Sequence, residues 1–132
     1  MKHIIALLAS AILFFSCKSE EERYFEAGKH LVAAADTANN HIDDWNNSLE
    51  KNPSLLIEPT MQDIFIDLDS VRFVALGMAS QALEKLHGER KDELQRLINE
   101  AKERVRRVEE RTQLAMKVAE TLNAEQKFPD EE

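Results

Sequence analysis

The sequence has few of the residues that interrupt helices or cross-link a chain. Its 132 residues include three glycines, three prolines and one cysteine. So few glycines and prolines cannot supply the many turns of a β-sandwich or a β-barrel. One cysteine excludes an internal disulfide framework and a zinc site built from several cysteines. The composition therefore favours an all-α protein with one domain at most.

Acidic residues outnumber basic ones. The chain has 25 Asp and Glu residues against 17 Lys and Arg residues, which gives a net charge of −8. Proteins that bind nucleic acid concentrate positive charge on the surface that meets the phosphates. The charge balance therefore argues against a nucleic-acid partner.

The N-terminus combines a positive start with a short apolar run. Lys2 precedes residues 4–15, which are uncharged and carry one hydroxyl, at Ser10. A permanent bilayer span needs roughly 20 apolar residues, so this run is too short. A positive start, an apolar middle and a small residue before the cut are typical of a signal peptide. The sequence predicts a cleaved signal helix over residues 1–16.

The only cysteine, Cys17, directly follows this leader. The stretch Leu13-Phe14-Phe15-Ser16-Cys17 resembles the lipobox of bacterial lipoproteins. The resemblance implies that Cys17 is lipidated, freed by the lipoprotein signal peptidase and usually N-acylated; an ordinary secretory leader is the alternative. Two or three acyl chains anchor a protein far more firmly than one. A membrane, reached through the N-terminal lipid, is therefore the first expected partner.

Residues 17–23 are predicted to form an acidic, lipid-anchored tether. Lys18, rather than Asp, follows the cysteine, which resembles outer-membrane sorting in enteric bacteria. Ser19-Glu20-Glu21-Glu22 is similar to the acidic tether of some surface-exported Bacteroidetes lipoproteins, with a solvated spacer as the alternative. The expected location is the bacterial cell envelope, at the periplasmic face or the outer surface of the outer membrane.

Residues 24–124 are predicted to form an up-down-up bundle of three long antiparallel helices, divided at Pro53 and Gly88. The outer two segments repeat apolar or small residues at alternate spacings of four and three, as helices that pack side by side do. These seams are Tyr24, Gly28, Leu31, Ala35, Ala38, Ile42, Trp45 and Leu49, then Leu94, Ile98, Ala101, Val105, Val108, Thr112, Ala115, Ala119 and Leu122. Poor helix formers predict a kink or restart near Asn40. Residues 125–132 are predicted to be a flexible acidic tail.

The middle segment, residues 59–86, carries the broadest apolar arc. It is therefore predicted to be the central helix, packed on both others. Arg72 projects from this apolar side, where an unpaired charge would be costly. A hairpin with a short loop places Asn40 and Asp44 near it, and Asp44 or Asp43 is the predicted partner.

Motifs for catalysis or metal binding are hard to find. The chain has no Gly-rich phosphate loop, no GxSxG elbow and no HExxH motif. His41 and Asp44 lie three residues apart, but zinc needs at least three protein ligands. Asp63 and Asp67 share a helix face and are more typical of a solvated face than of an acid/base pair. No catalytic residues, metal ligands or cofactors are therefore assigned, and the chain is expected not to be an enzyme.

An apolar stripe on the middle segment is the candidate contact surface. Ile66 and Phe73 lie seven residues apart on the side opposite the predicted core, and Ser70 and Gly77 complete the stripe. Exposed apolar pairs mark partner surfaces in some proteins. Cover by the loop of residues 53–58 or by a kinked first helix is the alternative.

Arg104, Arg107 and Arg111 form a basic strip on this acidic chain. The strip is expected to pair with Asp67 and Asp69 of the middle helix. Contact with lipopolysaccharide or another acidic polymer is the alternative.

Residues 122–126, Leu-Asn-Ala-Glu-Gln, are similar to the L-T-x-x-Q motif of the Spy/CpxP family of periplasmic helical stress chaperones and metal sensors. The alternative is an Asn that caps a helix end. The sequence thus predicts a lipid-anchored envelope protein that acts without catalysis, through a helical face, on an envelope protein partner or a second copy. A Spy/CpxP-like chaperone or metal-responsive factor is one alternative function, and an immunity or exclusion lipoprotein is another.

Overall fold

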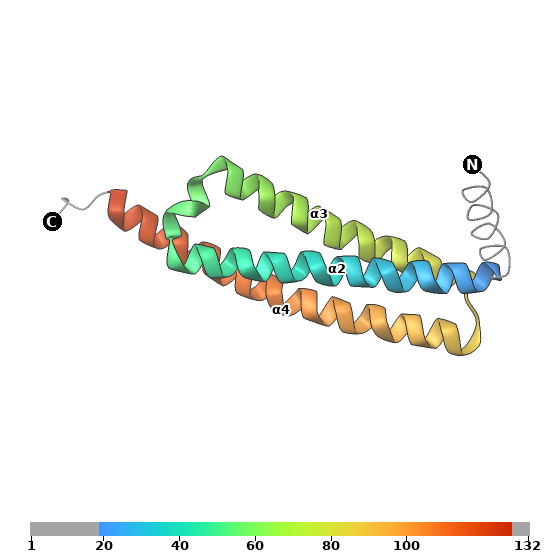
Figure 1. Cartoon of the computed structure of the whole chain (residues 1–132). Coiled ribbons are helices and arrows are strands. Elements are labelled where there is room, and N and C mark those ends of the chain that lie inside the picture. The colour runs from blue at the N-terminus through green and yellow to red at the C-terminus, as the bar shows by residue number, and fades with distance from the viewer. Residues whose placement is uncertain (1–18, 128–132) are drawn as a thin grey trace, which may run out of the picture.

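A computed structural model describes residues 19–127 and shows an all-α bundle (Figure 1). Three long helices run up, down and up: α2 (Glu20–Lys51), α3 (Pro59–Ala82) and α4 (Gly88–Lys127). Two short 3-10 helices, η1 (Pro53–Ile57) and η2 (Leu83–Lys85), follow α2 and α3. The predicted bundle of long antiparallel helices is confirmed. The signal helix over residues 1–16 and the lipidation site at Cys17 lie outside the described residues.

Local chemistry accounts for where the helices begin. The hydroxyl of Ser19 accepts a hydrogen bond of 3.1 Å from the backbone N–H of Glu22, which caps α2. Pro59 opens α3, where its missing N–H leaves no hydrogen bond unmade. Gly88 has a φ of +59°, in the left-handed region that favours glycine, and the chain turns there into α4.

Helix α2 begins inside the segment predicted to be a tether. Residues 20–23 form its first turn, where acidic side chains favour the positive end of the helix dipole. Glu21 accepts a hydrogen bond of 3.0 Å from the backbone N–H of His87, and Glu22 accepts one of 3.1 Å from Arg90. The acidic cluster is therefore part of the bundle rather than a spacer. Helix α4 likewise continues to Lys127, into the predicted tail.

One continuous helix passes through Asn40, so the predicted restart there is wrong (Figure 1). The polar residues of this stretch have other roles. Asn39 and Asn46 are buried, and each forms a hydrogen bond across the bundle, to Arg72 and to Thr112. These long-range bonds, together with packing, outweigh the low intrinsic helix propensity of asparagine.

Helix α2, rather than α3, is the central helix (Figure 1). Helices α3 and α4 each pack along α2 and touch one another little. The prediction that residues 59–86 form the centre is therefore wrong. The small residues Gly28, Ala35 and Ala38 are buried in α2, and such small side chains let neighbouring helices approach it closely. Part of the broad apolar arc of α3 stays exposed, including Ile64 and Val71.

Helices α2 and α4 run parallel in a single register. Core partners differ by 66 in number: Gly28 faces Leu94, and Asn46 donates to Thr112 at 2.8 Å. Flanking ion pairs differ by 68: Glu22–Arg90, Asp36–Arg104 and Asp43–Arg111. A constant offset is what two parallel helices with matching seven-residue repeats produce.

The basic strip therefore pairs with α2. Arg104 donates to Asp36 at 2.8 Å, and Arg111 reaches Glu50 as well as Asp43. Arg107 lies 3.5 Å from Glu103 on its own helix. The predicted pairing between helices is confirmed for Arg104 and Arg111 but is wrong for Arg107, and the predicted partners Asp67 and Asp69 are wrong. Those two residues belong to α3, which packs on a different flank of α2.

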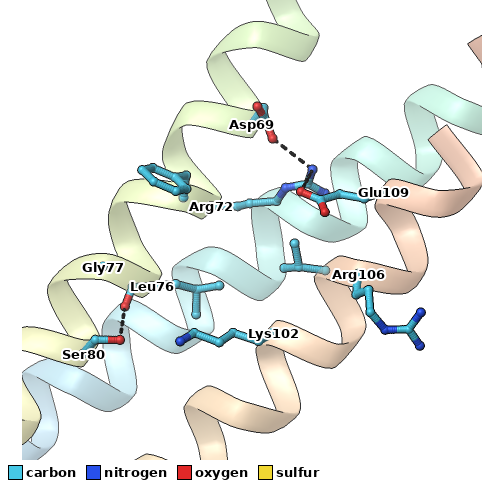
Figure 2. A pocket seen from close by; sticks show the side chains of 10 residues that line it. Asp69, Arg72, Leu76, Gly77, Ser80, Lys102, Arg106 and Glu109 are labelled. Carbon is cyan, nitrogen blue, oxygen red and sulfur yellow. Dashed lines mark hydrogen bonds and ion pairs between the residues drawn. The ribbon is translucent and has the colours of Figure 1, made fainter. Parts of the chain in front are cut away.

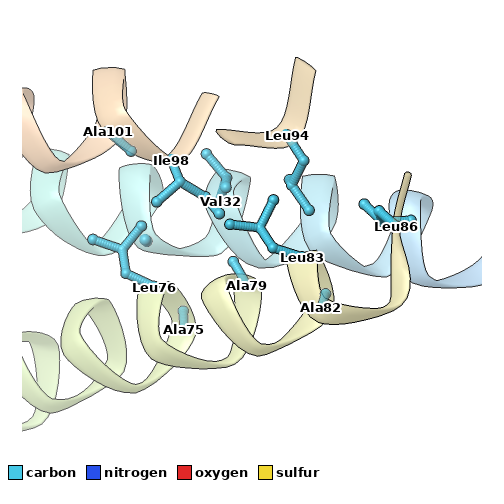
Figure 3. Close-up of a cluster of buried hydrophobic side chains, with 11 residues drawn as sticks. Val32, Ala75, Leu76, Ala79, Ala82, Leu83, Leu86, Leu94, Ile98 and Ala101 are labelled. Atoms are coloured by element: carbon cyan, nitrogen blue, oxygen red, sulfur yellow. The ribbon is translucent and has the colours of Figure 1, made fainter. Parts of the chain in front are cut away.

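The larger cluster of buried apolar side chains lies toward the Gly88 end of the bundle (Figure 3). There Val32 of α2, Leu83 of η2 and Leu94 and Ile98 of α4 are all buried together. At the other end, the indole N–H of Trp45 donates to the carbonyl of Met61 at 3.0 Å. The rings of Trp45 and Phe65 are 5.0 Å apart between centroids, and Phe65 is only partly buried. The half of the bundle near Pro59 is thus more open.

Gly28→Leu should lower the free energy of unfolding by about 1–3 kcal/mol, the usual range for an overpacked core. A Cβ at position 28 would lie 2.5 Å from a methyl carbon of Leu94, which is itself completely buried. Urea unfolding followed by circular dichroism would measure the change. The control Ala27→Leu, at the exposed neighbouring position, should stay within about 0.5 kcal/mol of the wild type. A Gly28→Leu variant as stable as this control would contradict the close approach of α2 and α4.

Candidate functional site

A groove lies between α3 and α4, because these two helices pack on α2 more than on each other. Its central pocket has a volume of about 390 Å³ and is lined by residues of both helices (Figure 2). An outer pocket of about 410 Å³ continues toward η1, lined by Trp45, Ile66, Met116 and others. The two pockets share no lining residue, but Ile66 of the outer pocket lies one helical turn along α3 from Asp69 of the central pocket. We call the whole feature the α3–α4 groove.

Both predicted contact residues line this groove. Phe73 belongs to the central pocket and is 80% exposed, and Ile66 belongs to the outer pocket and is 60% exposed. Ser70 and Gly77, on the same stripe, are also exposed. Neither the loop of residues 53–58 nor α2 covers the stripe, so the predicted exposure is confirmed. The role of Ile66 and Phe73 in binding a partner stays a prediction.

A buried cation, Arg72, lies in the central pocket (Figure 2), which Phe73 also lines. The side chain of Arg72, a residue only 2% exposed, forms three hydrogen bonds. It donates to Asn39 of α2 at 3.0 Å, to Asp69 of α3 at 2.9 Å and to Glu109 of α4 at 3.2 Å. The bond from Arg72 to Glu109 is the only hydrogen bond or ion pair between side chains that joins α3 to α4 within residues 19–127. Both carboxylates are about half exposed, so they stay hydrated while they neutralise the guanidinium.

The predicted partner of Arg72, Asp43 or Asp44, is wrong. The hairpin register itself is nearly as expected, since the observed partner Asn39 is close to these residues along α2. The difference lies in rotation about the helix axis. Asp43 faces α4 and pairs with Arg111, whereas Asp44 is exposed beside His41.

The α4 wall of the groove carries two cationic side chains, one without an acidic partner within residues 19–127 and one paired with acidic residues of its own helix. Lys102 reaches across toward Leu76 and Ser80, and it forms no hydrogen bond or ion pair within the described part of the chain (Figure 2). Arg106 instead binds Glu103 and Glu110 on its own helix. The hydrogen bond from Arg106 lowers the pKa of Glu103 to about 2. Lys102 is therefore the cation that the fold leaves available to a bound partner.

The groove combines an apolar wall with a charged rim. Phe73, Leu76 and Val105 supply apolar surface beside Asp69 and Lys102. Such a combination is typical of surfaces that bind other proteins. Along residues 19–127, no three His, Cys, Asp or Glu side chains come together as ligands for a metal ion. None of the helices in this range is both long and apolar enough to cross a bilayer.

Asn123, from the segment similar to the Spy/CpxP motif, lies inside α4 and not at its end. Its side-chain N–H donates to the carbonyl of Pro53 at 3.0 Å, which ties α4 to η1. The alternative of a helix cap is therefore wrong for this residue. Beside it, Leu114, Val118 and Leu122 form a second exposed apolar row, of which only Leu122 was assigned to the core.

Sequence reasoning missed most of the α4 wall and the roles of Asn39 and Asn46. Two signals in the sequence bear on them. Acidic residues on the first segment and arginines on the third both recur at seven-residue spacing, which indicates that these segments are neighbours. Asn39 and Asn46 directly follow the seam residues Ala38 and Trp45, and asparagines next to a buried seam indicate specific buried hydrogen bonds.

No family model, no curated protein and no solved structure matches this chain. The function of the groove must therefore be inferred from its geometry and chemistry.

Arg72→Ala should lower the free energy of unfolding by about 2–4 kcal/mol, since it leaves a cavity and an unpaired buried amide at Asn39. Arg72→Met combined with Asn39→Leu removes both polar groups and keeps much of the volume. This double variant should recover most of the loss, because an apolar replacement of a buried polar network is often neutral. Urea unfolding of all three proteins tests the argument. An Arg72→Ala loss below about 0.5 kcal/mol would show that the network contributes little.

Arg106→Gln should raise the pKa of Glu103 from about 2 toward its ordinary value of 4.5. The pair of Arg106 and Glu103 stabilises the fold at pH values at and above 4.5, the ordinary pKa of Glu103. This stabilisation is lost as the pH falls toward 2. Carbon-detected NMR titration of the Glu103 carboxyl would measure the change. Arg96→Gln, which removes a cation bound to Glu93 and Glu100, is the matched control and should leave Glu103 nearly unchanged. Equal pKa values of Glu103 in the wild type and in Arg106→Gln would contradict the assigned cause.

Proposed function

We propose that this chain is a lipid-anchored protein of the bacterial envelope that acts without catalysis, by docking a partner in the α3–α4 groove. The observation that carries the proposal is Phe73, an aromatic side chain 80% exposed in the apolar wall of a groove. Full burial of a phenylalanine side chain contributes about 1.5–3 kcal/mol. Apolar surface rimmed by polar residues is typical of interaction sites. Ile66, in the adjoining outer pocket, extends the same surface.

The proposed anchor is an acylated Cys17, at a short distance from the bundle. Only Lys18 and Ser19 separate Cys17 from the first turn of α2. The bond between Glu21 and His87 places the α3–α4 connection at the same end of the bundle. Acylation would therefore hold this end close to the membrane, which we expect to be the outer membrane. Confinement to a surface raises the effective concentration of a partner there, so a modest interface suffices.

Replacement of Phe73 by a photocrosslinking amino acid, in the full chain expressed in bacteria, should give a discrete covalent adduct of defined mass. Val74 is the matched control, because it is half exposed on a different flank of the same helix. Phe73→Asp should remove the same partner from affinity purification of the chain. An absence of adducts at position 73, or equal adducts at positions 73 and 74, would contradict a docking role for the groove.

Mass spectrometry of the native product should find Cys17 as an acylated N-terminal residue. The Cys17→Ser variant should not be acylated and should retain its leader, because the sulfur atom of Cys17 is the proposed attachment point of the lipid. An intact leader in the wild type, or a trimmed chain without fatty acids, would remove the anchoring half of the proposal. The groove would still be open to test in that case.

A further inference from the structure

The exposed stripe of α3 has the spacing of a second packing seam. Its residues are Ile66, Ser70, Phe73, Gly77 and Ser80, which follow one another at spacings of four, three, four and three. Alternate spacings of this kind place side chains along one side of a helix that packs on another helix. The first seam of α3 is used against α2, and four of the five residues of this stripe, all except Ser70, line the α3–α4 groove. The stripe therefore has the residue spacing of a surface that packs on another helix.

Large and small residues alternate at the centre of this stripe. Phe73 projects into solvent, and a Cβ at Gly77, one helical turn away, would meet no atom within 4 Å. When two copies of α3 pack antiparallel about a twofold axis, each Phe73 lies on the open surface at Gly77 of the other copy. In a parallel pair, Phe73 would instead meet Phe73, and Gly77 would meet Gly77. The surface around Phe73 and Gly77 is therefore complementary to itself in an antiparallel pair of α3 helices but not in a parallel pair.

We infer that the occupant of the α3–α4 groove is α3 of a second copy of this chain, in an antiparallel homodimer. The inference rests on the proposed function insofar as both place binding in this groove. A closed twofold interface uses the same surface on both subunits, which the reciprocal contact of Phe73 with Gly77 supplies. The two α3 helices and the two α4 helices would then form a four-helix core.

The size and charge of the groove fit this occupant. Its two pockets are lined by ten and eight residues, slightly fewer than the roughly 20–30 residues per side of a standard protein interface. In the register set by Phe73 on Gly77, Lys102 of one copy lies about one helical turn from Asp69 of the other. Lys102 has no hydrogen-bond or ion-pair partner along residues 19–127. Within the same range, the only cation bound to Asp69 is Arg72, which also binds Glu109. The dimer therefore supplies an opposite charge to the unpaired cation.

The arrangement has a consequence for anchoring. Antiparallel packing places the two N-terminal ends at opposite ends of the assembly. Both lipids can enter one membrane only when the long axis of the dimer lies along the bilayer surface. The paired α3 helices then lie at the middle of the dimer, between its two lipid-anchored ends.

Sedimentation analysis of the full chain, purified from the expressing bacterium in a non-ionic detergent, tests the inference. The wild type should sediment at twice the protein mass of one chain. Gly77→Leu should weaken dimerisation at least tenfold, because its side chain fills the space for Phe73, while the better helix former raises the thermal midpoint of the monomer. Phe73→Asp should also give monomers. Val74→Asp, on the other exposed flank of α3, should leave the dimer intact. A monomeric wild type at tens of micromolar, or a Gly77→Leu variant that dimerises as tightly as the wild type, would overturn the inference.

The mass of the photocrosslinked adduct at position 73 separates this inference from the proposed function. An adduct of two copies of the chain, absent when Gly77 is replaced by Leu, supports the homodimer. An adduct with a different envelope protein overturns the homodimer and leaves the proposed function standing. No adduct overturns both. In cells, cysteines at positions 73 and 77 of two differently tagged copies should form a disulfide between the copies, and a pair at positions 74 and 78 should not.

Discussion

The buried guanidinium of Arg72 is the point at which the three helices meet. It extends from α3, binds the amide of Asn39 in α2 and reaches the carboxylate of Glu109 in α4. A cation buried to this extent requires partners in fixed positions, because an unpaired charge in the interior costs several kcal/mol. The apolar seams alone would permit slippage along the bundle by a heptad. Asn39 and Arg72 can meet at only one alignment of α2 and α3, so the pair specifies the hairpin register.

A second polar pair and a row of ion pairs specify the register of α4. Asn46 binds Thr112 in the core, and Arg104 and Arg111 bind carboxylates of α2 along the flank. Because both neighbours of α2 are aligned in this way, α2 becomes the centre and α3 is left with a broad apolar surface. The open groove between α3 and α4 is a direct consequence of that arrangement. Its exposed Phe73 and its unpaired Lys102 are the features on which the proposed contacts depend.

The proposed anchor and the groove are linked through the acidic start of α2. Glu21 binds His87 in the connection between α3 and α4, and Glu22 binds Arg90 in α4, so the chain enters the folded bundle only a few residues after Cys17. A lipid at Cys17 would therefore restrict where the groove can point as well as where the protein resides. A flexible tether would leave both neighbouring copies and other partners free to approach from any direction. A short one favours partners that share the same membrane.

Periodicity and composition were sufficient to predict the three helices and their approximate ends. The low content of Gly and Pro, the breaks at Pro53 and Gly88, and the seams of the outer helices are local properties that act over a few turns. The same periodicity predicted that Ile66 and Phe73 share a face away from the core, and both are exposed. Which helix is central was not predictable in this way. A wide apolar arc shows that a helix has surface to bury, but not that a neighbour covers all of it.

The sequence by itself determined which residues lie on which face of each helix, because the helical repeat follows from backbone geometry. Only the tertiary structure decided which faces meet. Asn39 and Asp43 lie four residues apart, so they differ by about one helical turn along α2 and by roughly 40° around it. No local pattern specifies which of them Arg72 meets. The α3–α4 groove is likewise a property of the assembled bundle, since its walls come from helices that pack on a third one instead of on each other.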